Sequence, residues 1–69
     1  MTAHQTAARK VAATALLTEA MGHLEVAARG AYFGGDTETG HAAATAYHHA
    51  AEALTKLTGH DPRPTEETA

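Results

Sequence analysis

Four residues with metal-ligating side chains occur at spacings that two packed helices could bring together. Glu19 and His23 are four residues apart, and His49 and Glu52 are three residues apart. Residues at these spacings share one face of an α-helix. If the chain reverses near Gly35, an antiparallel arrangement places His49 opposite the segment between Glu19 and His23. Two imidazoles and one or two carboxylates at one level are a ligand set for a divalent transition metal, and helix bundles build metal sites in this way.

The same residues have two other interpretations. Glu19 and His23 form an ordinary i, i+4 pair of a helix surface, and histidines at the edge of an apolar face commonly act only as amphipathic covering groups. A cluster of ion pairs that responds to pH is the third interpretation, because histidine titrates in the mildly acidic range. The ordinary surface role is favoured, and a divalent transition metal is the only cofactor that these residues could hold.

Two further histidines, His41 and His48, are seven residues apart. That spacing is about 10 Å along a helix, too far for the two to share one ion, and we expect both to face solvent. Tyr47 falls on the apolar stripe of its helix and is expected in the core. The sequence contains no Ser-His-Asp arrangement, phosphate-binding loop, zinc-finger spacing or dinucleotide motif. It therefore predicts a protein without enzymatic activity.

These residues must be positioned by two long helical segments, and the first is predicted over about residues 3–33. Thr2 and Gln5 have the spacing of a capping box, and the alanine-rich sequence that follows has a high helix propensity. Gly30 is one place where this helix could end. We favour an end at Gly34-Gly35, because Ala31 still falls on the apolar stripe.

The second helix is predicted over about residues 37–58. Asp36 or Thr39 would be its N-cap, and Gly59 is the expected C-terminal stop. Residues 59–69 contain two prolines and no apolar anchor, which predicts a flexible tail. Because the connection between the helices is short, they must run antiparallel. The predicted fold is therefore an all-α, antiparallel two-helix hairpin over residues 1–58.

The first helix carries apolar residues on two opposite faces. Its main stripe consists of Ala13, Leu17, Ala20, Leu24, Ala27 and Ala31, broadened by Leu16 and Met21. The far side carries Val11, Ala15, Gly22 and Val26. The second helix has a single stripe, formed by Ala43, Tyr47, Ala50, Leu54 and Leu57 with Ala46 and Ala53 beside it. A helix that is apolar on two sides is normally buried on two sides. A second copy would supply the missing surface, which predicts a homodimeric four-helix bundle with the far side as the oligomer interface.

The chain has 69 residues, no cysteine and a formal net charge of -3. Its five basic residues are scattered and do not form the stripe that phosphate neutralisation needs, so we expect no nucleic-acid partner. No apolar run is long enough for a membrane span or a signal peptide, which favours a cytoplasmic protein without membrane contact.

A chain this small commonly gains stability by self-association. We therefore expect a homo-oligomeric interaction or regulatory module, with an unidentified protein partner left open.

Overall fold

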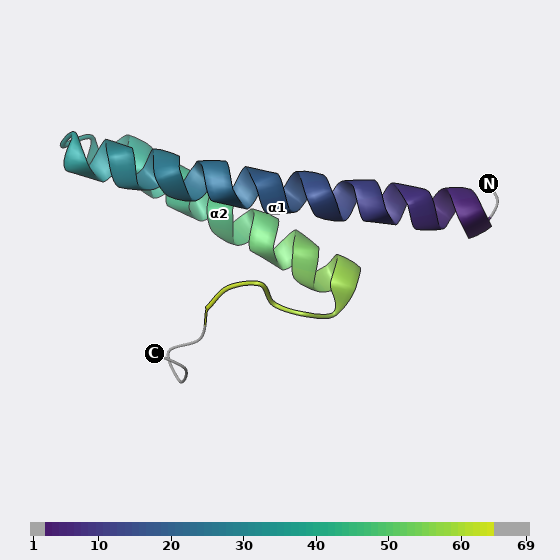
Figure 1. The fold of residues 1–69 in the computed structure, drawn as a ribbon. Coiled ribbons are helices and arrows are strands. Elements are labelled where there is room, and N and C mark those ends of the chain that lie inside the picture. Colours follow the sequence, from purple (N-terminus) through teal and green to yellow (C-terminus); the bar gives the residue numbers. More distant parts are fainter. Residues whose placement is uncertain (1–2, 65–69) are drawn as a thin grey trace.

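The structure is a computed structural model, and it describes residues 3–64. Two α-helices, α1 (Ala3–Phe33) and α2 (Thr37–Thr58), pack side by side as an antiparallel hairpin (Figure 1). The predicted all-α two-helix hairpin is therefore confirmed. The helix α1 continues through Gly30, as the position of Ala31 on the apolar stripe indicated. The capping box predicted from Thr2 lies outside the described residues.

The C-terminus of α1 is closed by a tight turn. The backbone N–H of Asp36 donates to the carbonyl of Ala31 at 2.9 Å, and that of Gly35 donates to the carbonyl of Tyr32 at 3.1 Å. These two hydrogen bonds form a Schellman motif. Gly35 has a φ of 84°, a left-handed conformation that glycine adopts without a Cβ clash. The turn therefore reverses the chain within the short segment between the helices.

Both ends of α2 are capped by its own neighbouring residues. The carboxylate of Asp36 accepts hydrogen bonds from the backbone N–H of Thr39 at 3.1 Å and from its hydroxyl at 2.6 Å. These hydrogen bonds, the hydroxyl first and then the backbone N–H, lower the pKa of Asp36. At the other end, Gly59 has a φ of 76°, and its N–H donates to the carbonyl of Thr55 at 2.8 Å. Asp36 is therefore the N-cap, and Gly59 ends the helix as predicted.

The buried core of the hairpin is small. It is formed by Met21 from α1 and by Ala50, Ala51 and Leu54 from α2, with Leu17 and Tyr47 packed against it. Ala51 is fully buried. Met21 and Leu54 are the only large side chains in this cluster, and each contributes about 1.5–3 kcal/mol when buried. One hairpin alone therefore has little apolar burial for two helices of this length.

The predicted stripe of α1 largely faces α2, since Leu17 and Leu24 are half-buried and Met21 is buried, but the buried face is rotated slightly from it. Met21 and Ala28 are buried, whereas Leu16 is 65% exposed and Ala27 is exposed. Met21 and Ala28 are seven residues apart, so they lie on one side of the helix. The small side chain of Ala28 allows α2 to approach closely on that side. Leu16 and Ala27, which were assigned to the stripe, are therefore not part of the contact.

The buried face of α2 is rotated in a similar way. Ala50 and Leu54 are buried as expected, but Ala51 and Gly40 are buried as well, although neither was assigned to the stripe. A Cβ atom on Gly40 would lie 2.8 Å from the ring of Tyr32, closer than side chains pack. The same ring makes an edge-to-face contact with His41 at a centroid distance of 5.6 Å. The lack of a side chain at Gly40 therefore makes room for an aromatic contact beside the turn.

The two helices differ in length, and the difference leaves part of α1 without a neighbour. The helix α1 has 31 residues and α2 has 22, so α1 is longer by about 14 Å. The excess lies at the N-terminal end of α1, which extends past the end of α2 (Figure 1). Residues 3–12, which we call the overhang, are all exposed. Neither helix within residues 3–64 is long and apolar enough to cross a membrane.

Candidate interaction surface

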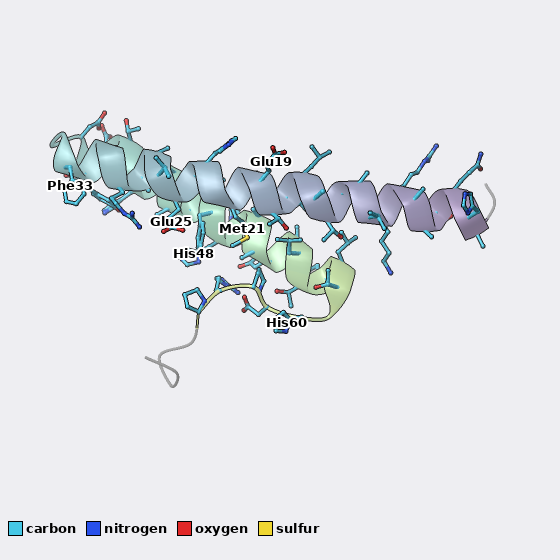
Figure 2. The ribbon with its side chains drawn as sticks, viewed as in Figure 1. Glu19, Met21, Glu25, Phe33, His48 and His60 are labelled. Atoms are coloured by element: carbon cyan, nitrogen blue, oxygen red, sulfur yellow. The ribbon has the colours of Figure 1, made fainter. Side chains whose placement is uncertain are left out.

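The structure does not bring the predicted metal ligands together. Glu19 and His23 are each two residues from Met21, and His49 is two residues from Ala51. Two residues correspond to about 200° around a helix. Because Met21 and Ala51 face the other helix, the predicted ligands lie on the outer sides of α1 and α2 and are exposed. Figure 2 shows Glu19 on the edge of α1 that points away from α2.

Glu52, the fourth predicted ligand, is also exposed. Within residues 3–64, no group of three or more histidine, aspartate or glutamate side chains is arranged to hold a metal ion. The site expected from one hairpin is therefore not assembled. The reason is helix rotation. In the predicted stripe His49 lies at the edge of the apolar face, but the burial of Ala51 turns His49 to the far side.

His41 and His48 are exposed, as predicted. His48 makes an edge-to-face contact with the ring of Tyr47 at a centroid distance of 5.3 Å. Its Nδ1 atom also accepts a hydrogen bond from Nη1 of Arg63 at 3.2 Å. Tyr47 packs against the core, as predicted, and His48 covers its outer edge.

Arg63 connects the segment after α2 back to that helix. Its guanidinium and backbone N–H donate to the carboxylate of Asp61 at 2.8–2.9 Å. The hydrogen bond from the Arg63 side chain is the main cause that lowers the pKa of Asp61 to about 2. The sequence of this segment does not predict the contact, because a lone arginine between prolines has no apolar periodicity. The flexibility predicted for residues 59–69 stays a prediction, and residues 65–69 lie outside the described part.

The far side of α1 is left uncovered by α2. Val11 is 71% exposed and Val26 is 68% exposed. Ala15 and Gly22 between them are exposed too, and a Cβ atom on Gly22 would meet nothing within 4 Å. We call Val11, Ala15, Gly22 and Val26 the outer row. These residues line the side of α1 that no other part of residues 3–64 covers.

Phe33 extends the same side of α1 and was missed by the sequence analysis. It is 86% exposed, and Figure 2 shows it at the end of α1, clear of α2. Phe33 comes seven residues after Val26, so the two lie on nearly the same side of the helix, with a drift of about 20° per heptad. That spacing was the signal that could have identified it.

The arrangement therefore leaves large apolar side chains exposed along one side of α1. No cavity is found on the described part of the chain. The charged pair nearest to the outer row, Arg29 and Glu25, is joined at 2.7 Å within α1 and is largely exposed, so it adds little to stability.

No protein-family model matches this chain, and no match is found among curated proteins or among solved structures.

Proposed function

We propose that this protein is a non-enzymatic interaction module, a helical hairpin that assembles with copies of itself through the outer side of α1. The observation that carries this proposal is the exposure of large apolar side chains along one side of a helix. Val11, Val26 and Phe33 are 71%, 68% and 86% exposed. Large apolar side chains that a fold leaves exposed along one side of a helix mark candidate sites of protein association.

Association would supply burial that one hairpin lacks. The core of the hairpin contains only two large buried side chains, Met21 and Leu54. Covering a valine contributes up to about 1.5–3 kcal/mol, so the two valines of the outer row are comparable with that core. Two hairpins joined through this side would form a four-helix bundle with α1 at its centre.

The composition favours a protein partner over nucleic acid. The chain carries five basic and eight acidic residues, whereas nucleic-acid binding depends on clustered positive charge. Apolar contact along a helix is the mode by which helical proteins recognise one another. The partner that this surface fits is therefore another helix.

A charge placed in the outer row tests the proposal. In Val26→Asp the carboxylate would have to be desolvated in the assembly. We expect the mass measured by light scattering to fall to that of one chain, or the chain to unfold, at concentrations where the wild type is assembled. Thr45→Asp is the matched control, because Thr45 is exposed on α2 and away from the outer row. A wild type that is a monomer at tens of micromolar would refute the proposal, as would a Val26→Asp variant with wild-type mass.

A further inference from the structure

The outer row is symmetric about a point on α1. Val11 and Val26 lie equally far from the position midway between Thr18 and Glu19, and so do Ala15 and Gly22. Within the row, the larger side chains are at the two ends, and the two smallest lie about one helical turn to either side of the centre, which Thr18 and Glu19 flank. A row read in the opposite direction would therefore also present two small residues between two valines.

This symmetry is what a two-fold interface requires. In such an interface, residue i of one copy contacts residue j of the other, and j contacts i. Building on the self-assembly proposed above, we infer that α1 pairs antiparallel with α1 of a second copy, with the two-fold axis between Thr18 and Glu19. Val11 then lies against Val26 of the partner subunit, and Ala15 lies against Gly22 of the partner subunit. Ala15 and Gly22, about one helical turn to either side of the axis, allow the two helices to approach closely at those levels.

The length of α1 supports the same axis independently. The helix runs from Ala3 to Phe33, and its midpoint is Thr18. An antiparallel pair centred there overlaps over almost the whole of both helices. A helix of 31 residues is about 46 Å long and about 10 Å wide, so the contact strip is on the order of 500 Å² per chain. The pair then buries on the order of 1,000 Å² in total, which is at the lower limit for a specific interface.

The overhang has a place in this arrangement. Its residues, 3–12, lie alongside the C-terminal half of α1 in the second copy, where Phe33 is exposed. Phe33 is as far from the axis as His4, so the exposed ring meets the first turns of the overhang. The two parts of α1 that α2 leaves most exposed therefore cover each other.

The ends of α1 favour the antiparallel direction over the parallel one. The first turn of α1 has no acidic residue and the last turn has no basic residue. In α2, by contrast, Glu38 lies in the first turn and Lys56 in the last. Antiparallel pairing brings the negative C-terminal end of one α1 dipole beside the positive N-terminal end of the other. Parallel pairing would place like ends together.

Disulfide cross-linking tests the pairing, because the chain has no cysteine of its own. We would prepare Val11→Cys and Val26→Cys and oxidise each alone and as a mixture. In the inferred dimer, two Val11 positions are about 22 Å apart along the axis, whereas a disulfide needs Cα atoms within about 7 Å. We therefore expect the mixture to cross-link at least tenfold faster than either variant alone. Ala15→Cys mixed with Gly22→Cys should behave in the same way.

The outcomes separate this inference from the proposed function. All four substituted positions are exposed, so circular dichroism should show unchanged helicity. Val11→Cys that cross-links by itself as fast as in the mixture would establish parallel pairing and overturn the inference. A dimer by light scattering in which neither mixture cross-links would overturn it as well. In both cases self-assembly itself stands, whereas a wild-type monomer at the same concentration would remove both.

Discussion

The helix α2 carries its apolar residues on the side that contacts α1, whereas α1 carries apolar residues on that side and on the opposite side too. The ends of the helices differ in the same sense. Asp36 and Gly59 cap α2, and Glu38 and Lys56 complement its dipole. The first and last turns of α1 contain no charge of the complementary sign. The apolar face and the caps of α2 therefore all act within one chain. The second apolar side of α1 has no contact within it.

This contrast separates two tasks in a short sequence. The contact between the helices requires only the segment of α1 that faces α2. The helix α2 is too short to reach the overhang at the N-terminal end of α1. The additional length of α1 adds exposed residues to the hairpin without adding to its core. This surface contributes nothing within one chain, and it is the surface that the proposed association would cover.

The largest effect is expected from the inner side of the hairpin. Leu54 is 3% exposed, and removing its side chain in Leu54→Ala should lower the free energy of unfolding by about 2–5 kcal/mol. Leu16→Ala is the matched control, because Leu16 is 65% exposed and should change stability by no more than about 0.5 kcal/mol. Urea denaturation followed by circular dichroism measures both. An equal loss in the two variants would mean that Leu16 is covered in solution and that the contrast between the two sides is wrong.

A second effect is expected from two glycines that differ in their surroundings. In Gly40→Ala the new methyl group would lie 2.8 Å from the ring of Tyr32, whereas in Gly30→Ala it would meet nothing within 4 Å. Both substitutions gain the same helix propensity. We therefore expect Gly40→Ala to be less stable than Gly30→Ala by about 1–3 kcal/mol, the cost of overpacking. The same denaturation experiment checks this, and equal stabilities would mean that the contact of Tyr32 with α2 is loose.

A smaller effect is expected from the cap of α2 at low pH. The hydrogen bonds from Thr39 lower the pKa of Asp36 below its ordinary value of 3.8. The folded chain therefore binds this proton more weakly than the unfolded chain, and the stabilisation is present above the ordinary value. It is lost as the pH falls from there through the lowered pKa of the folded chain. Asp36→Asn keeps a good N-cap without a titrating group.

Thermal melts of the wild type and of Asp36→Asn at pH 7 and near pH 3 measure this effect. We expect the difference in melting temperature between the two proteins to shift in favour of Asp36→Asn as the pH falls. The comparison with the variant removes the contribution of Asp61, whose pKa is also lowered, to about 2. A difference that does not change with pH would mean that the carboxylate of Asp36 does not cap the helix in solution.

The sequence predicted the hairpin, its turn and its caps because these depend on local chemistry. Gly35 and Gly59 lack a Cβ atom and can adopt the left-handed conformation that ends a helix. The carboxylate of Asp36 accepts a hydrogen bond from the first turn of α2. The exposure of the outer row could also be predicted, since a single apolar face of α2 covers only one side of α1. These features depend on the order of residues along one helix or one turn.

The rotation of each helix about its axis could not be predicted in this way. Alanines surround the true contact line on both helices, so several rotations bury similar apolar area. In the structure, Ala28, Ala51 and Gly40 are small residues buried at the contact. Which rotation buries them depends on the shapes of both helices together. The observed rotation of α2 differs from the predicted one by a fraction of a turn. This difference places His49 on the outer side and not at the edge of the contact. The predicted metal ligands were lost for that reason.

The smallest effect is therefore expected for metal binding. With Glu19, His23 and His49 on the outer sides of the hairpin, one chain offers at most an i, i+4 pair, which binds a transition metal weakly compared with a set of three or four ligands. We expect calorimetric titration with zinc at neutral pH to give equally weak binding for the wild type and His49→Ala. His23→Ala is the control that removes the only such pair on α1. Tight binding that requires both His23 and His49 would show that the helices rotate in solution. The assignment of inner and outer sides of α1 would then be wrong.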